Sequence, residues 1–201
     1  MPAAEGGTTA ALSFANTAAA SNIRYLTDYP GVLGTNARTV MAWIKAAISQ
    51  PDTGPTIVGY GANSTANRYT LRLNSDGRLR IECSGVVGLA SSASPDLRDN
   101  AWHHVAVTLP ANGRGSNFVL YVDGAVTPQA VPTGGGTLLN TLAGGLTVGI
   151  GGSSHAANYD FNGSIDDVRI YDHDLTPAEI AAIVFGPGTP LRFQCRQPRN
   201  R

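Results

Sequence analysis

The sequence predicts an all-β protein with one short helix near its C-terminal end. Of its 201 residues, 24 are glycine and 12 are proline, which is typical of many short strands joined by turns. Only 14% of the residues are charged, and this disfavours long amphipathic helices. Short segments of alternating apolar and polar residues indicate the strands. The length fits one domain, and we place a leader at 1–10, the domain at 11–185 and a tail at 186–201.

A strand is predicted over residues 165–171, which read IDDVRIY. Successive side chains in a strand point to opposite faces of the sheet. Strict alternation would therefore place Val168 and Ile170 on one face with Asp166, and Ile165 on the other face.

A capped helix follows this strand almost at once. Thr176 supplies an N-cap hydroxyl, Pro177 suits the first helical position, and Glu179 stands three residues after the cap. This spacing predicts a capping box and a helix of about two turns. The glycine at position 186 marks its end.

Further strands are predicted from runs of alternating or continuous apolar residues. The clearest hairpin pairs residues 69–73 with 79–83 around the turn 74–77, which reads NSDG. We expect the other strands at 11–16, 22–27, 38–47, 56–61, 102–109, 117–122 and 146–150.

Charge and hydropathy exclude several classes of partner. Lysine plus arginine and aspartate plus glutamate each total 14, so the formal net charge is zero and no broad basic surface for nucleic acid is expected. The N-terminal stretch lacks the basic and apolar regions of a secretory signal peptide. No run reaches membrane-spanning length, so membrane insertion is not predicted.

Two features of the chain have more than one interpretation. Cys83 and Cys195 are the only thiols, and they either stay free or form one disulfide that ties the tail to a strand. Four arginines in the last ten residues either dock on an acidic neighbour or belong to a frayed terminus; they are Arg192, Arg196, Arg199 and Arg201.

Six motifs follow one another in a fixed order along the chain. They are VMAWIK at 40–45, LNSDGRL at 73–79, WHHVAV at 102–107, LYVDG at 120–124, GSIDDVRIY at 163–171 and LTPAEI at 175–180. Together they resemble the laminin-G-like, concanavalin A-like lectin/glucanase jelly-roll family. The resemblance runs from about Leu12 to Val184 and implies a two-sheet antiparallel jelly-roll sandwich of about 14 strands. Members of that family include carbohydrate-binding modules, adhesion domains, pentraxin-like proteins and modules on phage particles.

Many members of this family hold calcium with an acidic residue of an early strand and a later aspartate pair. Here the early strand reads Phe14-Ala15-Asn16, so the first carboxylate is missing, and Asp166 and Asp123 are left as candidate calcium ligands. Since Ca²⁺ takes about six to eight oxygen ligands, we assign no metal site and no cofactor. Calcium stays as an alternative, to be tested at Asp166.

The sequence does not predict an enzyme. The glucanases of this superfold need two neighbouring carboxylates, and Glu82 has no acidic residue two or four positions away. His103 shares a strand face with Val105, so we expect a core histidine rather than a catalytic one. Trp43 and Trp102 stand in apolar strands and are likewise expected in the core.

Carbohydrate binding is instead assigned to loops, where exposed rings and planar polar groups stack on and hydrogen-bond a glycan. No catalytic residue is assigned. The predicted carbohydrate-binding residues are Tyr60, Asn63, Arg68, His155 and Tyr159.

These observations predict a non-catalytic surface module. Our first hypothesis is a structural or adhesion protein of a virion, such as a decoration, tail or fibre subunit, that contacts other subunits of the particle and binds cell-surface glycan. The alternative is a carbohydrate-binding or adhesion module of a larger secreted bacterial protein. A glycoside hydrolase or lyase is a third hypothesis. The expected location is a virion surface or the extracellular space.

Overall fold

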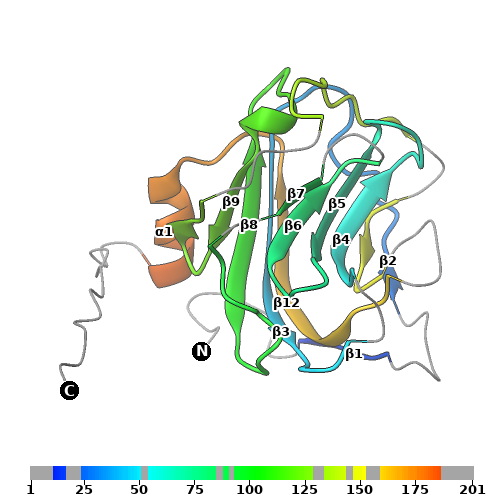
Figure 1. Ribbon diagram of the computed structural model, residues 1–201. Coiled ribbons are helices and arrows are strands. Elements are labelled where there is room, and N and C mark those ends of the chain that lie inside the picture. Colours follow the sequence, from blue (N-terminus) through cyan, green and yellow to red (C-terminus); the bar gives the residue numbers. More distant parts are fainter. Residues whose placement is uncertain are drawn as a thin grey trace.

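A computed structural model describes residues 11–16, 24–50, 54–84, 88–90, 93–128, 134–143, 147–152 and 159–186. These residues form two six-stranded antiparallel sheets and one α-helix (Figure 1). No helix among them is long and apolar enough to cross a membrane.

The first sheet has the strand order β1-β12-β3-β8-β9-β10, and the second has the order β2-β11-β4-β5-β6-β7. The first consists of β1 (Leu12–Ala15), β12 (Asn162–Tyr171), β3 (Arg38–Ala46), β8 (His103–Leu109), β9 (Val119–Val122) and β10 (Ala125–Val126). The second consists of β2 (Tyr25–Leu26), β11 (Gly149–Ile150), β4 (Thr56–Gly61), β5 (Arg68–Leu73), β6 (Leu79–Glu82) and β7 (Gly88–Ala90). A 3₁₀ turn, η1 (Gly115–Asn117), occupies the start of the strand predicted at 117–122.

The main core lies between the two sheets and is built by alternation along the strands. Val105 and Val107 of β8 face inward from the first sheet, and Leu71 of β5 and Ile81 of β6 face inward from the second. All four are fully buried. This two-layer arrangement confirms the predicted jelly-roll sandwich.

A β-bulge in β12 changes which side chains face the core. The pairing of β12 with β3 shifts register between Asp166 and Arg169, and Asp167 has a positive φ of 47°. One extra residue reverses the alternation, so Ile165, before the bulge, and Val168, after it, both pack against the main core. The predicted placement of Ile165 opposite Val168 is therefore wrong.

The helix α1 (Pro177–Phe185) covers part of the outer face of the first sheet (Figure 1). Ile180 of the helix packs in a second buried cluster with Met41, Ala106 and Tyr121 of the sheet. The predicted capping box is present, since Thr176 and Glu179 each accept a hydrogen bond from the other's backbone N–H. The helix thereby closes this outer face.

A buried arginine organises the end of the sandwich at which β3 begins. Arg38 is fully buried, and its guanidinium donates five hydrogen bonds of 2.7–3.1 Å to loop acceptors. The acceptors are the carbonyls of Val32, Gly34 and Asn36 and the hydroxyl of Thr141.

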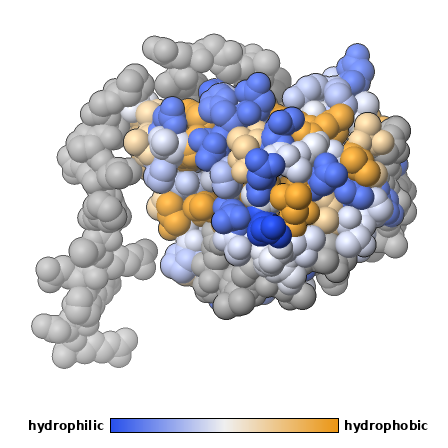
Figure 2. All heavy atoms as spheres, turned by 90° about the horizontal axis from the view of Figure 1, so that it is seen from above, coloured by the Kyte–Doolittle hydropathy of each residue, from blue (hydrophilic) through white to orange (hydrophobic). Residues whose placement is uncertain are grey.

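Seen from above, the described residues of the surface show hydrophilic and hydrophobic side chains interspersed (Figure 2).

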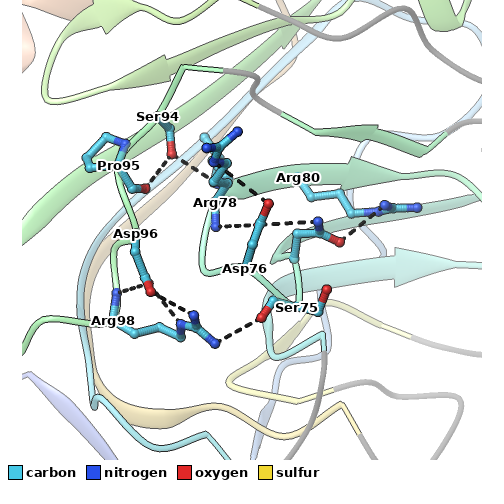
Figure 3. Close-up of polar contacts among 10 residues, drawn as sticks. Ser75, Asp76, Arg78, Arg80, Ser94, Pro95, Asp96 and Arg98 are labelled. Atoms are coloured by element: carbon cyan, nitrogen blue, oxygen red, sulfur yellow. Dashed lines mark hydrogen bonds and ion pairs between the residues drawn. The ribbon is translucent and has the colours of Figure 1, made fainter.

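The predicted hairpin is formed by β5 and β6, and its turn is held by a neighbouring segment (Figure 3). The N–H of Gly77 donates to the carbonyl of Asn74, and the positive φ of Gly77, 77°, suits glycine. Arg98 binds both oxygens of Asp96 and donates to the carbonyl of Ser75. These contacts hold the turn that joins β5 to β6.

Three of the residues expected in the core are not fully buried. His103 stands at the start of β8 and contacts two carboxylates, 2.9 Å from Asp123 and 3.2 Å from Asp99. These carboxylates raise the pKa of His103 to about 9, and the Asp123 hydrogen bond is the largest cause. Trp43 and Trp102 are only partly buried, and the Trp43 ring meets the ring of His104 edge-on.

Candidate functional site

The candidate site is the outward face of the hairpin formed by β5 and β6. Because side chains alternate along each strand, burial of Tyr69, Leu71, Leu79 and Ile81 in the core leaves their neighbours pointing outward. The outward residues are Arg68, Thr70 and Arg72 on β5 and Arg80 and Glu82 on β6. The sheet thus presents three arginines and one glutamate side by side.

Glu82 binds all three of these arginines. Its two carboxylate oxygens lie 2.9 Å from Nη2 of Arg68 and 2.7 Å from Nη2 of Arg72. Nε of Arg80 is 3.4 Å from the second oxygen. The four side chains retain only 13–26% of their exposure, so they form a recessed cluster, which we call the arginine cluster.

Two residues outside the hairpin complete the arrangement. The side-chain oxygen of Asn63, in the loop before β5, accepts a hydrogen bond of 3.1 Å from Nη1 of Arg68. The guanidinium of Arg72 lies over the ring of Tyr159, 5.3 Å from its centroid, at a distance typical of a cation–π contact. Asn63, the arginine cluster and Tyr159 therefore form one continuous polar network.

The electrostatics of the cluster are unbalanced. Three guanidinium groups face one carboxylate, so the four side chains carry a net charge of about +2 at neutral pH. Burial lowers the pKa of Arg72, and the positive charges of Arg80 and Arg68 lower it further, against the opposing effect of Glu82. The cluster therefore has capacity for a further negative charge.

The structure brings together three of the five residues predicted to bind carbohydrate. Asn63, Arg68 and Tyr159 all belong to the polar network described above. Their role in binding stays a prediction. One face of the Tyr159 ring is covered by Arg72, so that face is not available to stack on a sugar.

The other two predicted residues do not join this network. Tyr60 was predicted to offer an exposed ring, and this is wrong. It lies in β4, is fully buried and stacks on Tyr69 at 5.0 Å between ring centroids. Val58 and Tyr60 share the inward face of that strand, so the ring belongs to the core. His155 lies outside the described residues.

Sequence reasoning missed Arg72, Arg80 and Glu82 as site residues. The signal was present in the hairpin, because R-x-T-x-R in residues 68–72 and R-x-E in residues 80–82 place like residues on one face. What the sequence does not give is the register that sets Arg72 directly opposite Arg80.

The residues considered as calcium ligands have other partners. Asp123 accepts hydrogen bonds from His103 and from the backbone N–H of His104, and Asp166 accepts one from the N–H of Asp167. Asn16 donates to the carbonyl of Phe161. Within the described part of the chain, no group of three or more His, Cys, Asp or Glu side chains is arranged to hold a metal ion.

The proposed disulfide involves one described residue. Cys83 is fully buried in the main core beside the inward residues of β6. Burial raises the pKa of its thiol. Cys195 lies outside the described residues.

Comparison with solved structures finds several proteins of similar fold. The CBM40 domain of the Ruminococcus gnavus IT-sialidase, bound to α2,3-sialyllactose, shares 14% identity at a TM-score of 0.56, over 82% of this chain and 99% of that chain. Domain 4 of an extracellular GH43 arabinanase from Geobacillus stearothermophilus, in complex with arabinotriose, shares 20% identity at a TM-score of 0.58, over 90% of this chain and 82% of that chain. A heptameric SAP-like pentraxin from Limulus polyphemus shares 19% identity at a TM-score of 0.55, over 86% of this chain and 80% of that chain.

At these identities the likeness establishes the fold and no ligand. No curated protein matches the sequence. The model of the concanavalin A-like lectin/glucanases superfamily matches residues 16–181, which is most of the chain and nearly all of the described sandwich. Together with the two packed antiparallel sheets, this match shows that the chain belongs to the concanavalin A-like lectin/glucanase superfamily.

Proposed function

We propose that this chain is a non-catalytic carbohydrate-binding module that works outside the cell, and that it binds glycan on the outward face of the β5–β6 hairpin. The observation that carries the proposal is the polar network of Asn63, the arginine cluster and Tyr159. Planar guanidinium and amide groups beside an aromatic ring are the groups that orient a sugar through hydrogen bonds and stacking.

The opposite outer face is less suited to a ligand. Part of the first sheet is covered by α1, whose Ile180 packs on Met41 and Tyr121. The outward face of β5 and β6 has no such helix over it within the described residues (Figure 1). Binding is therefore assigned to the second sheet.

The contacts of Glu82 favour binding over catalysis. Both of its carboxylate oxygens are held by guanidinium groups at 2.7–2.9 Å, so neither is free to attack an anomeric carbon. A glycosidase also needs a second carboxyl group about 5–10 Å away. The groups that surround Glu82 in the cluster are arginines.

The solved structures support a module more than a virion subunit. Two of those described above are carbohydrate-binding or saccharide-bound domains of larger enzymes. The proposal thus follows the second of the sequence-based hypotheses.

A glycan array with immobilised neutral and acidic oligosaccharides tests the proposal. We expect the wild-type chain to bind a subset of the glycans and the variant Arg68→Gln to lose that binding. The matched control is Arg78→Gln, which removes a charge from the exposed Arg78–Asp76 pair beside the hairpin turn. Absence of binding to every glycan, or release of reducing sugar from bound polysaccharide, would contradict the proposal.

A further inference from the structure

Two arginines occupy directly opposite positions on neighbouring strands. Arg72 of β5 pairs in register with Arg80 of β6, and both side chains point outward. Like charges at directly opposite positions destabilise a sheet. Arg68, two outward positions before Arg72 on β5, adds a third positive charge on the same face.

A single carboxylate only partly offsets this repulsion. Glu82 contacts all three guanidinium groups, yet two positive charges remain uncompensated within the cluster. Among the described residues, the buried Nε atoms of Arg68 and Arg72 have no hydrogen-bond partner, and Nε of Arg80 has only the long 3.4 Å contact with Glu82. A buried donor without a partner is destabilising, because it has lost its hydrogen bonds to water. An ion-pair network shaped for stability alone would not combine excess charge with unpaired donors.

We propose that the arginine cluster recognises the carboxylate of an acidic saccharide, such as a uronic or a sialic acid. This inference rests on the proposed function and specifies its ligand class. The guanidinium groups of Arg68 and Arg72 already hold one carboxylate on its two oxygens, so the geometry accepts this group. A second carboxylate beside Glu82 would reduce the net charge of the cluster from about +2 to about +1.

The neighbouring residues keep the guanidinium groups in place for such a ligand. Arg68 is tied to Asn63, Arg72 rests on the Tyr159 ring, and Arg80 donates to the side chain of Asn74 in the hairpin turn at 3.3 Å. Each arginine is therefore fixed by a contact outside the cluster. Arginines fixed in this way lose less side-chain entropy on binding.

Titration calorimetry with paired probes tests the inference. The first pair is sialyllactose and lactose, and the second is oligogalacturonate and its fully methyl-esterified form, which removes the charge from the same backbone. We expect the carboxylated member of at least one pair to bind about tenfold or more tightly than its neutral partner, which corresponds to about 1.4 kcal/mol. This preference should weaken as salt is raised.

Variants show whether the cluster is responsible. Arg72→Gln and Arg80→Gln should each reduce the preference for the carboxylated probe by about tenfold. Arg78→Gln removes the same charge outside the cluster and should leave the preference unchanged. Thermal unfolding of each variant without ligand identifies any variant that fails to fold. Arg80→Gln is the safer of the two because Arg80 makes the longer contact with Glu82, 3.4 Å against 2.7 Å for Arg72, and is the more exposed.

The possible outcomes separate the inference from the function beneath it. Equal binding of the charged and neutral members would overturn the carboxylate inference and leave a carbohydrate-binding module. Binding of a sulfated, carboxyl-free carrageenan oligosaccharide in place of both carboxylated probes would overturn it in the same way. Failure of every probe, neutral ones such as arabinotriose included, would count against the proposed function itself.

Discussion

Replacement of Glu82 by glutamine removes the only negative charge of the arginine cluster and keeps the side-chain shape. Three guanidinium groups that lie 2.7–3.4 Å from the carboxylate would then face one another without an anion. An ion pair at 4 Å is worth about 4 kcal/mol at an effective dielectric constant of about 20, before desolvation is subtracted. Loss of one partner from a buried charge pair costs about 3–5 kcal/mol.

The expected loss for Glu82→Gln is smaller than that range because the cluster keeps some contact with solvent. The four side chains are 13–26% exposed, so we expect a loss of about 2–4 kcal/mol. For a chain of this size each kcal/mol lowers Tm by about 2–4 °C, which gives a decrease of about 4–16 °C.

Thermal unfolding followed by circular dichroism measures this decrease. Asp76→Asn is the matched control, since Asp76 pairs with Arg78 at 3.7 Å and both side chains are exposed, so its loss should stay below about 1 kcal/mol. Between about 0.1 M and 1 M salt the screening length falls from about 10 Å to 3 Å, and the gap between Glu82→Gln and wild type should narrow. If Glu82→Gln unfolds no earlier than Asp76→Asn, the charge argument is wrong.

Three further predictions concern stability. Arg38→Met should lower the free energy of unfolding, measured in urea, by about 3–5 kcal/mol, because three loop carbonyls and a hydroxyl lose a fully buried donor. A loss as small as that of the exposed control Arg78→Met would contradict the role of Arg38 in holding these loops. The pKa of His103 is raised to about 9, so its ion pair with Asp123 stabilises the fold fully below about pH 6.5 and is lost as pH rises through 9. Tm should therefore fall between these two pH values. A His103→Gln variant whose Tm falls with pH as steeply as that of the wild type would refute this assignment. Thr176→Ala should cost about 1 kcal/mol by loss of the helix N-cap, measured by urea unfolding, whereas Thr176→Ser should retain the cap.

Local patterns predicted the elements of this fold well. The capping box at Thr176 and Glu179 and the hairpin around the turn 74–77 both depend on neighbouring residues, and both are present in the structure. The strand at Thr56–Gly61 has the predicted bounds. Interactions between residues close in sequence leave a readable signature because the chain itself fixes their geometry.

Features that depend on residues far apart in the sequence were harder to predict. The bulge at Asp167 inserts one residue opposite β3, and alternation within β12 carries no sign of it. His103 was predicted to lie in the core because it shares a strand face with apolar residues. In the structure Asp99 and Asp123, which lie in adjacent loops, contact its two ring nitrogens. Tyr60 illustrates the opposite case, since its own strand already placed it with Val58 on the inward face.

The candidate site was recovered in part for the same reason. Asn63 and Arg68 are five positions apart and their meeting is a local event, whereas the position of Tyr159 over Arg72 depends on the fold as a whole. The three arginines were visible as a pattern along β5 and β6. Their convergence on Glu82 requires the cross-strand register, which only the folded sheet supplies.

Inward and outward side chains alternate along β5 and β6, and this alternation separates positions that the core constrains from positions that it does not. Leu71 and Ile81 hold the two layers together, while Arg72 and Arg80, one position away, contribute nothing to that core. If the proposed site is correct, exchange of Arg72 and Arg80 would alter ligand preference and leave the packing between the two sheets unchanged. Among proteins that share this sandwich, divergence in specificity is expected to concentrate at the outward positions of this hairpin, so a library randomised there is the natural starting point for redirecting the module to a new sugar.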